Sequence, residues 1–563
     1  MNREQIISML KQNPEVTVLI VGGGINGVGV FRDLAANGVD VLLVERADFC
    51  SGSSAASSHM AHGGIRYLEN GEFRLVREAV KERNRLIENA PHIVKPLPTV
   101  IPIFKFWSGL LNAPLKFLNL LDRPSERGAF VIKVGLLFYD AFTRDQGTVP
   151  PHKFYKRDQA LAEHPHLNPE IQYAATYYDG SIASPERLAL ELIMDAEAEG
   201  GHARALNYCS LVGVDGGKVS LRDEETGQTM DVAPKLIINA AGPWIDSANH
   251  ALGIDRHYIG GTKGSHLVLN HPELREAIGR NEFFFENKDG RIVLIFPFYD
   301  RVIIGTSDIP IENPDDARCT EDEVDYFIEL VSRVFPNIKV GREQVVFRFS
   351  GVRPLEYSKA KTTGQISRDH SLLEDKFGGI PVYSLVGGKW TTYRAFSEQV
   401  TDKVLAYLGL PRKADTRKAP IGGGRDFPWT GYALLEFLNR VESETGLGGL
   451  EPKRLFDKYG TRATEFAAYI AKGADEKLTN MPSWSRREIE YLAHKEKVLH
   501  LGDLLLRRST LAWLGMLTRE GLDEFASVLG DALGWTSERK GAEIQRTLSL
   551  LKDRHGVKLE AGS

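Results

Sequence analysis

The sequence is poor in cysteine, has no excess of basic charge and lacks long apolar runs. Only three cysteines, Cys50, Cys209 and Cys319, occur among 563 residues, and their wide separation excludes a disulfide framework and a CxxC-type zinc or iron–sulfur site. The 70 Lys and Arg residues are outnumbered by 75 Asp and Glu, and the net charge of -5 argues against nucleic-acid binding as the main activity. We therefore expect no metal site and no nucleic-acid partner, and a reducing, cytoplasmic compartment.

Membrane-spanning and secretory segments are also missing. No run of about 18 uninterrupted apolar residues occurs, so no transmembrane helix is predicted, and the polar start from Met1 to Lys11 does not resemble a secretory signal. Peripheral membrane binding stays open, because amphipathic segments escape this test. With 42% hydrophobic and 26% charged residues, the composition is typical of a globular protein. The length predicts three or four domains, or two large ones.

The clearest signal lies in the first fifty residues. The apolar run Val16 to Val21 predicts a strand that is buried on both faces, as in a parallel sheet. Ile25 to Asn37 then predicts a helix, and Val39 to Val44 a second buried strand. The three segments together predict a βαβ unit.

Three glycines and one glutamate in this unit form a dinucleotide fingerprint. Gly22 permits the tight turn from strand to helix, Gly24 lets the backbone approach a pyrophosphate, and Gly27 permits close helix–sheet packing. The N-terminus of the helix attracts phosphate, and Glu45 can accept hydrogen bonds from ribose hydroxyls. The motif predicts an adenine dinucleotide but does not choose between NAD and FAD.

Two later segments favour FAD. The small side chains from Ser51 to Ser58 would let the backbone pass close to an extended ligand, although a flexible linker can have the same composition. The predicted strand Lys235 to Asn239 runs into the small residues Ala240 to Gly242, which suits a long dinucleotide. No second complete G-x-G-x-x-G follows a strand, so a separate NAD(P)H site is not indicated.

Further along the chain, five segments resemble those of the FAD-dependent glycerol-3-phosphate dehydrogenases of the aerobic, membrane-associated type. They follow one another in the family's order: Ser57 to Glu69 (SSHMAHGGIRYLE), Gly264 to His266, Ile304 to Asp308, Gly351 to Leu355 and Gly387 to Arg394. The first segment departs from the family pattern at two positions. His59 stands where a basic residue is expected, and Ala61 where a larger aliphatic residue is expected.

The resemblance implies an enzyme of glycerol metabolism. It would oxidise sn-glycerol 3-phosphate to dihydroxyacetone phosphate, with hydride transfer from C2 to flavin N5 of FAD and electrons passed to the quinone pool. The family is peripheral on the inner face of the cell membrane, and a homodimer is compatible with it. Three alternatives stay open: an oxidase that uses O2, a dehydrogenase of a related polyol phosphate such as erythritol 4-phosphate, and a flavin-binding regulatory or interaction protein.

Candidate site residues follow from the resemblance and from the chemistry of a phosphate dianion. Arginine is favoured because its planar fork binds two phosphate oxygens, and the proposed substrate-binding residues are Arg66, Tyr67, Arg353, Arg368, Lys389 and Thr306. A histidine has a suitable pKa for the C2 hydroxyl proton, so the catalytic candidates are His266, then His62, together with Arg353. The cofactor candidates are Gly22, Gly24, Gly27, Glu45, Ser53, Ser57, Gly63, Gly242, Gly388 and Lys389.

The sequence predicts an α/β fold in three parts. A Rossmann-like FAD-binding domain takes residues 1–95 and returns at 180–257 and 345–400, where Val345 to Phe349 and Val382 to Val386 read as its strands. An antiparallel-sheet substrate or cap domain takes 96–179 and 258–344. A linker at 401–426 precedes an all-helical C-terminal domain at 427–563. The aromatic-rich segment Ile103 to Leu121 fits either a helix pair on the cap domain or an interfacial membrane anchor.

Overall fold

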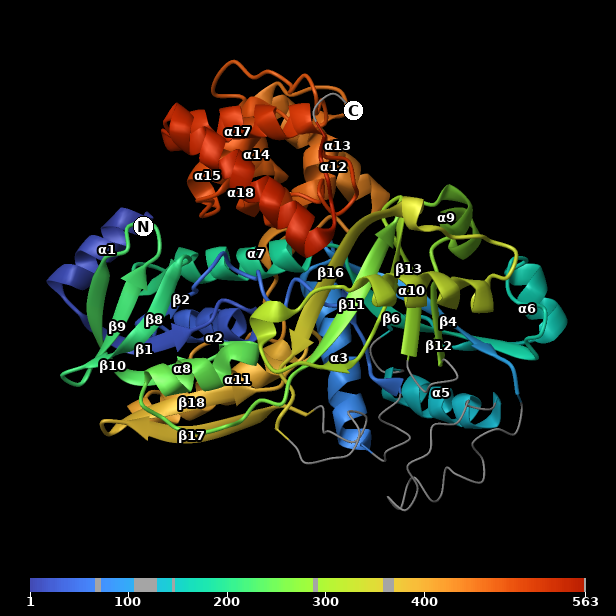
Figure 1. The fold of residues 1–563 in the computed structure, drawn as a ribbon, viewed down its shortest axis with the longest axis horizontal. Coiled ribbons are helices and arrows are strands. Elements are labelled where there is room, and N and C mark those ends of the chain that lie inside the picture. Colours follow the sequence, from blue (N-terminus) through green and yellow to red (C-terminus); the bar gives the residue numbers. More distant parts are fainter. Residues whose placement is uncertain (66–71, 106–128, 144–146, 287–291, 358–368, 561–563) are drawn as a thin grey trace.

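Two β-sheets lie side by side under a group of C-terminal helices (Figure 1). The computed structural model describes residues 1–65, 72–105, 129–143, 147–286, 292–357 and 369–560. Within these residues, the first sheet has eight strands and the second has ten. The predicted combination of a nucleotide-binding α/β domain, a second sheet and a helical C-terminal domain is confirmed.

The first sheet is parallel from β18 to β7, and it has antiparallel strands at its β17 edge and in the β8–β9 hairpin. Its order is β17-β18-β10-β1-β2-β7, with β9 pairing to β10 and β8 to β9. The neighbours of β1 run parallel to it, whereas β17–β18, β9–β10 and β8–β9 are antiparallel. The strands are β1 (Glu15–Val21), β2 (Val41–Val44), β7 (Ala203–Leu206), β8 (Cys209–Asp215), β9 (Lys218–Asp223), β10 (Thr229–Asn239), β17 (Ser371–Phe377) and β18 (Ile380–Val386).

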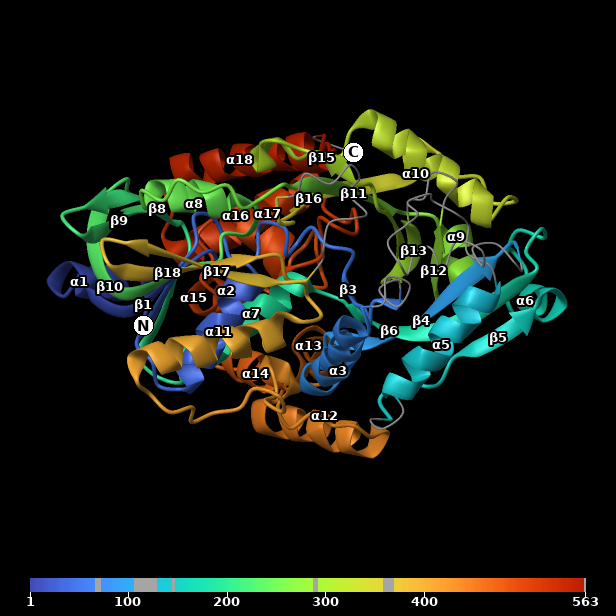
Figure 2. The ribbon, with the colours of Figure 1, turned by 90° about the horizontal axis from the view of Figure 1, so that it is seen from below.

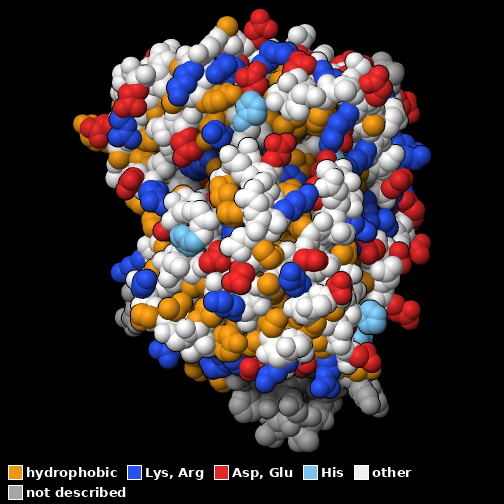
Figure 3. Space-filling model, turned by 90° about the vertical axis from the view of Figure 1, so that its left-hand side faces the viewer, with side chains coloured by type: hydrophobic (Ala, Val, Ile, Leu, Met, Phe, Trp, Pro, Cys, Tyr) orange, Lys and Arg blue, Asp and Glu red, His pale blue; other side chains and the backbone are white. Residues whose placement is uncertain are grey.

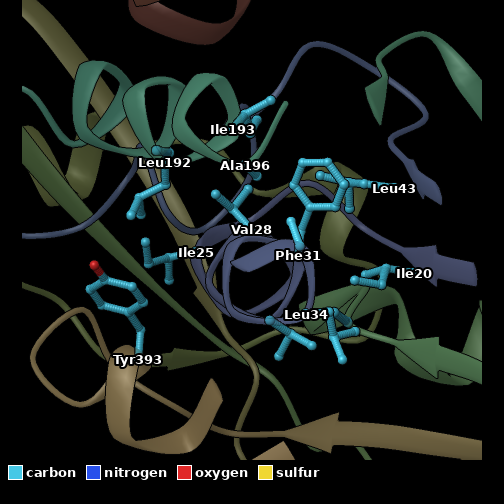
Figure 4. Packing of buried hydrophobic residues seen from close by; sticks show 14 of the residues in the cluster. Ile20, Ile25, Val28, Phe31, Leu34, Leu43, Leu192, Ile193, Ala196 and Tyr393 are labelled. Carbon is cyan, nitrogen blue, oxygen red and sulfur yellow. The ribbon is translucent and has the colours of Figure 1, made fainter. Parts of the chain in front are cut away.

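The predicted βαβ unit is present and packs as a parallel-sheet unit should. Helix α2 (Ile25–Ala36) ends where Gly38 takes a φ of +75°, and β2 follows. Figure 4 shows Val28 and Phe31 of α2 pointing toward Leu192 and Ile193 of α7 (Pro185–Ala198). Most residues of α2 are buried, and the helix packs between the sheet, α7 and α11 (Tyr393–Leu408).

The second sheet is mostly antiparallel. Its order is β15-β11-β14-β13-β12-β4-β6-β3, with β16 pairing to β11 and β5 to β6. Only the β4–β12 pair is parallel among the pairs that the structure describes. The strands are β3 (Met60–Ala61), β4 (Val94–Ile103), β5 (Lys153–Lys156), β6 (Tyr173–Ile182), β11 (Thr262–Leu269), β12 (Glu282–Glu286), β13 (Ile292–Phe298), β14 (Arg301–Gly305), β15 (Ile309–Pro310) and β16 (Val345–Arg353).

The two faces of the second sheet pack against different partners. On one face, Leu267 of β11 and Ile304 of β14 join a cluster with Phe327 of α10 (Glu321–Val334). On the other face, Phe347 and Phe349 of β16 join the core of the C-terminal helices. The alternation of side chains along each strand therefore ties this sheet to the C-terminal domain.

Several further helices cover the two sheets. They are α1 (Arg3–Gln12), α3 (Phe73–Asn89), α5 (Ala129–Thr143), α6 (Arg157–Glu163), α8 (Ile245–Ala251) and α9 (Pro272–Ile278). The C-terminal domain contains α12 (Gly431–Thr445), α13 (Glu451–Tyr459), α14 (Ala463–Ile470), α15 (Arg486–Lys495), α16 (Leu501–Asp503), a π-helical turn (Leu504–Arg508), α17 (Arg519–Leu533) and α18 (Ser537–His555). Among the helices that the structure describes, none is both long and apolar enough to cross a bilayer.

Four predicted domain boundaries, those at residues 95, 180, 345 and 401, differ from the strand pairing and helix ends of the structure. Residues 345–353 form β16, which pairs with β11 in the second sheet, so the return to the first sheet begins only with β17. Residues 60–61 and 94–95, predicted for the first domain, also belong to strands of the second sheet, as do residues 180–182. The predicted linker at 401–426 is helical up to Leu408, because α11 continues to that residue.

The surface carries interspersed charges of both signs. Figure 3 shows Lys and Arg side chains mixed with Asp and Glu over the face that lies at the left of Figure 1. This mixture agrees with the small net charge of -5.

Candidate active site

The glycine turn after β1 is fixed by close backbone contacts. Gly22 has a φ of +110°, and a Cβ there would lie 2.5 Å from the carbonyl oxygen of Ala240. A Cβ on Gly27 would overlap the carbonyl oxygen of Gly22. Gly24 is the N-cap of α2 and has no side chain to cap the helix. The first N–H groups of α2 have no partner within the helix, and its first turn contains no acidic residue, so this end can receive an anion.

Glu45 lies at the end of β2, beside this turn. One of its carboxylate oxygens accepts a hydrogen bond from Gly23 N at 2.7 Å, and the other accepts one from Ala47 N at 3.0 Å. Burial raises the pKa of Glu45, and these two backbone donors act in the opposite direction. Since each carboxylate oxygen has a second lone pair, Glu45 can still accept hydrogen bonds from ribose hydroxyls.

Ser54 brings two distant segments to the start of α2. Its Oγ accepts a hydrogen bond from Ile25 N at 2.9 Å, and its carbonyl oxygen accepts one from Trp390 Nε1 at 2.8 Å. Asn26 Nδ2 donates to the carbonyl oxygen of Gly387 at 3.0 Å. The loop before α11 therefore lies across the N-terminal end of α2.

The rest of this loop reaches the first family-like segment. Gly388 has a φ of +90°, and a Cβ there would lie 2.5 Å from Asn26 Nδ2. The ammonium nitrogen of Lys389 is shielded from solvent. His62 N donates to Thr391 Oγ1 at 2.9 Å, which fixes the backbone of that histidine beside the loop.

His266 lies on β11 of the second sheet and is buried. Its Nε2 lies 2.8 Å from Ser58 Oγ, and its ring stacks on Phe349 with a centroid distance of 4.7 Å and an interplanar angle of 5°. A Cβ on Gly305 would overlap the imidazole, so glycine at that position makes room for the ring. Burial lowers the pKa of His266 well below its ordinary value, and the charge of Arg353 acts in the same direction.

Arg353, at the end of β16, lies on the same face of this sheet. Its Nη1 donates to Asp308 Oδ1 at 3.1 Å, and its Nη2 donates to Thr306 Oγ1 at 2.9 Å and to the carbonyl oxygen of Ser307 at 3.1 Å. A Cβ on Gly264 would overlap the guanidinium. These contacts hold the guanidinium flat against the sheet, with His266 two positions along the same strand as Gly264.

The small-residue segment Ser51 to Ser58 joins the two sheets. Ser53 Oγ donates to the carbonyl oxygen of Val352 at 2.6 Å, and a Cβ on Gly351 would lie 2.6 Å from the carbonyl oxygen of Ala56. Ser58 completes the connection through its contact with His266. The interpretation of this segment as a flexible linker is therefore wrong: the segment packs tightly between the glycine turn and the His266–Arg353 face.

Three more of the predicted cofactor residues, Ser57, Gly63 and Gly242, lie farther along the chain than the glycine turn. Gly63 N donates to Asp179 Oδ1 at 2.9 Å, and a Cβ on Gly63 would overlap Tyr139. Ser57 Oγ accepts a hydrogen bond from His59 N at 3.3 Å. Gly242, with a φ of +58°, follows β10, and a Cβ there would meet only open space.

Other predictions fall outside the residues that the structure describes. These are the substrate-binding candidates Arg66, Tyr67 and Arg368, and most of the aromatic-rich segment, namely residues 106–121.

Sequence reasoning missed four residues that hold the site together. They are Asn26, Ser54, Ser58 and Thr391, and each makes a hydrogen bond to a segment that is distant in sequence. All four lie in or next to segments that were singled out, so their location was visible. Their hydrogen-bond partners could not be predicted, because no local pattern indicates contacts between residues that are 29 to 361 positions apart.

The residues present fit an adenine dinucleotide with a long reach. The glycine turn and the first turn of α2 offer backbone N–H groups to a pyrophosphate, and Glu45 offers a carboxylate to ribose. The segment Ser51 to Ser58 and the loop Gly387 to Thr391 continue from this end to His266 and Arg353. This continuity suits FAD, whose flavin would lie between the glycine turn and the second sheet.

Comparison with known proteins agrees with this fit. A family model described as FAD dependent oxidoreductase matches residues 17–394, and one described as the C-terminal domain of alpha-glycerophosphate oxidase matches residues 414–540. The chain is 33% identical to a glycerol-3-phosphate dehydrogenase from Synechocystis sp., with 95% of this chain and 96% of the relative covered. It is 31% identical to a glycerol-3-phosphate dehydrogenase from Pseudomonas tolaasii, with 88% and 91% covered.

A solved structure shows the same fold along nearly the whole chain. The X-ray structure of the glycerol-3-phosphate dehydrogenase from Bacillus halodurans, complexed with FAD, has a TM-score of 0.74 and 23% identity, and the match covers 98% of this chain and 97% of that one. The glycine turn, the continuous path to His266 and Arg353, and both family models lead to one conclusion. The chain belongs to the family of FAD-dependent glycerol-3-phosphate dehydrogenases, and FAD is its cofactor.

Proposed function

We propose that this chain oxidises the C2 hydroxyl of sn-glycerol 3-phosphate to a ketone and passes the electrons to a membrane quinone. The observation that carries the proposal is the placement of His266, Arg353 and Thr306 on one glycine-lined face of the second sheet. The segment from Ser53 to Ser58 connects this face to the FAD-binding turn. A cation and a proton acceptor thus lie at the flavin end of the cofactor site.

Arg353 is the residue that we assign to the substrate phosphate. Its guanidinium is already oriented by Thr306, Ser307 and Asp308, so little side-chain freedom is lost when a dianion binds. Asp308 offsets part of its charge, and further cations are needed for a dianion. Lys389 lies in the neighbouring loop, and Arg66, Tyr67 and Arg368 complete the proposed set.

His266 is the residue that we assign to the proton of the C2 hydroxyl. Its lowered pKa makes the imidazole neutral at pH 7, so that it can accept a proton. When Nε2–H donates to Ser58 Oγ, Nδ1 keeps its lone pair for the substrate. A phosphate dianion beside Arg353 offsets the positive charge there and raises the proton affinity of His266. Bound FAD supplies the hydride acceptor.

Anaerobic reduction of the bound flavin tests the substrate. We expect loss of flavin absorbance with sn-glycerol 3-phosphate and almost none with glycerol, which lacks the phosphate. Faster loss with erythritol 4-phosphate would replace the substrate that we propose. If no polyol phosphate reduces the flavin, the chain is a flavin-binding protein of another kind.

Replacement of His266 or His62 by glutamine tests which histidine accepts the proton of the C2 hydroxyl. We expect the larger loss of flavin reduction rate for H266Q.

Reoxidation of the reduced enzyme tests the acceptor. We expect a water-soluble quinone analogue to restore the flavin spectrum much faster than air does. Rapid formation of hydrogen peroxide in air, without quinone, would instead favour the oxidase.

A membrane surface is the place where a quinone is available, and one side of the molecule suits it. Helices α3 and α5 lie next to each other on the side seen in Figure 2. Phe130, Val134, Leu137 and Phe138 of α5 are each 37–55% exposed, and Phe73 of α3 packs beside Phe138. The exposed Lys133 lies among them. Apolar side chains interspersed with basic ones are typical of a helix that lies on an anionic membrane surface.

A further inference from the structure

One side chain of the C-terminal domain packs against the aromatic residues next to His266. Trp513 follows the π-helical turn Leu504–Arg508 and is 5% exposed, and its Nε1 donates to the carbonyl oxygen of Leu506 at 3.1 Å. Its ring lies 4.8 Å from that of Phe349 and 4.8 Å from that of Phe347, both on β16. The indole is therefore anchored in the C-terminal domain and packed against the second sheet.

Phe349 connects Trp513 to His266. Its ring stacks almost parallel on the imidazole, and the indole of Trp513 packs against the same ring at an interplanar angle of 60°. In a close-packed interior, removal of one such ring leaves space into which its neighbours or water can move. The orientation of His266 thus depends on a residue that lies 247 positions away in sequence.

His59 also packs against these aromatic side chains, from a third side. Its ring lies 5.1 Å from Trp513, 5.5 Å from Phe298 and 6.2 Å from Phe349, and the residue is 2% exposed. The backbone of Ala55 is the polar group that acts on this ring, and it opposes the effect of burial on the pKa of His59. The adjacent Ser58 carries the hydroxyl that contacts His266 Nε2.

The surroundings of His59 require a neutral side chain. Burial lowers the pKa of His59 to about 4, so the imidazole is uncharged at pH 7. The residue has a φ of +53°, a conformation in which side chains other than glycine are uncommon and which here directs the ring into the aromatic cluster. His59 is therefore an uncharged ring packed among aromatic side chains.

We propose that Trp513 and His59 are positioning residues for His266, and that the C-terminal domain thereby controls the orientation and the water exposure of the proposed proton acceptor. The inference rests on the proposed role of His266. Trp513 acts through Phe349, and His59 acts by packing and by fixing the neighbouring Ser58.

Replacement of Trp513 by leucine tests the part played by the C-terminal domain. The titratable groups that act on His266 are Arg353 and His59, and neither is changed by this substitution. Water that enters the space left by the indole reduces the desolvation of His266 and raises its pKa toward 6.5. Since the neutral ring is the active form, the acid limb of the kcat/KM profile should move to higher pH. We expect kcat to fall about tenfold, corresponding to misplacement of a general base, while FAD stays bound.

Trp484→Leu is the matched control. Trp484 is equally buried in the C-terminal domain and packs on Phe525, away from His266. Its loss should lower thermal stability to a similar extent without moving the pH profile, and Trp513→Phe should restore the profile. Identical pH profiles for W513L and W484L would overturn the proposal. If H266Q itself left kcat and the pH profile unchanged, the proposed function of His266 would be wrong instead.

A pair of substitutions at His59 separates packing from chemistry. Both His59→Ala and His59→Phe keep the same backbone strain, but only phenylalanine refills the space between Trp513 and Phe298. We expect H59A to lower kcat and H59F to restore most of it. If both variants are equally impaired while flavin fluorescence shows FAD still bound, the nitrogens of His59 take part in the reaction and the packing role is wrong. A fully active H59A would also contradict the proposal.

Discussion

Glycines determine the geometry of this site at the scale of single residues, in two different ways. Gly22 and Gly27 are needed by the backbone around the cofactor turn, and their spacing alone predicted that role. Gly264 and Gly305 are needed because the side chains of Arg353 and His266 lie over them. The second role could not be predicted from the sequence, since it depends on strand pairing between residues that are 39 to 89 positions apart.

Gly264→Ala tests this arrangement. The three heavy atoms nearest to the new Cβ belong to the guanidinium of Arg353, at the far end of its side chain and not in the backbone, so the fold should be retained while the guanidinium is displaced. We expect the KM for sn-glycerol 3-phosphate to rise about tenfold, equivalent to roughly 1.4 kcal/mol of binding, with an unchanged FAD content. Steady-state kinetics and the flavin spectrum measure both quantities. Gly213→Ala, at a glycine whose Cβ would meet nothing within 4 Å, is the control. Equal KM values for the two variants would mean that Arg353 does not bind the substrate.

His500 is a second residue whose role appears only in the structure. The structure places it between Glu225 and Glu543, with Nε2 and Nδ1 each 2.7 Å from a carboxylate oxygen. Although burial acts in the opposite direction, hydrogen bonds to Glu225 and Glu543 raise the pKa of His500 from 6.5 to about 9. The ion pairs link the helical domain to the hairpin between β9 and β10.

The raised pKa of His500 predicts a pH-dependent stability. Because the folded state binds this proton more tightly than the unfolded state, the stabilisation is complete below pH 6.5 and is lost as the pH rises through about 9. We expect the free energy of unfolding of the wild type to exceed that of His500→Gln at pH 6, and the difference to vanish near pH 10. Urea denaturation at both pH values measures it. A difference that grows with pH would contradict the ion-pair assignment.

At the scale of elements, local sequence patterns predicted where strands and helices lie better than they predicted which elements pack or pair with one another. The alternation in residues 345–349 correctly indicated a strand, but its apolar residues fit either sheet. It belongs to the second sheet because Phe347 and Phe349 pack against the C-terminal helices, a contact with residues that follow it by more than 100 positions. By contrast, the βαβ unit was predicted almost to the residue, since its signals are local: a buried strand, a glycine turn and an apolar helix.

The exposed face of α5 leads to a prediction about membrane binding. Leu137→Ser together with Phe138→Ser removes two of its most exposed apolar side chains without opening the core. We expect the double variant to lose most of its binding to vesicles that contain anionic phospholipid, because burial of each large side chain contributes about 1.5–3 kcal/mol. Sedimentation with vesicles measures binding. Leu450→Ser, at an exposed leucine of the C-terminal domain, is the control. Unchanged sedimentation of the double variant would exclude this face of α5.

At the scale of the whole molecule, buried charges join the helical domain to the cofactor domain. Asp48 lies three residues after Glu45 and is completely buried. It forms ion pairs with Arg507 and with Arg508, whose Nη1 and Nη2 lie 2.5 and 3.0 Å from its two oxygens. The sequence alone could not reveal this contact, because Asp48 lies 459 residues from Arg507. The pair of arginines fixes the loop that follows Glu45.

Asp48→Asn tests how strongly this contact joins the two domains. The amide keeps the shape but removes the charge that the two arginines share. Arg507 retains its ion pair with Asp503, whereas buried Arg508 is left with the carbonyl oxygen of Glu496. We expect this loss to cost about 3–5 kcal/mol in the free energy of unfolding. Asp415→Asn, which breaks an exposed pair with Arg417, should cost no more than about 1 kcal/mol.

The charges of Arg508 and Arg507 lower the pKa of Asp48 to about 2 against the effect of burial. The stabilisation is therefore present above pH 3.8 and is lost as the pH falls toward 2. Denaturant unfolding from pH 7 to pH 3 should accordingly show a wild-type advantage over D48N that shrinks only at the acid end, accompanied by earlier FAD release in D48N. Equal stability of D48N and D415N at pH 7 would mean that the helical domain docks without this ion pair.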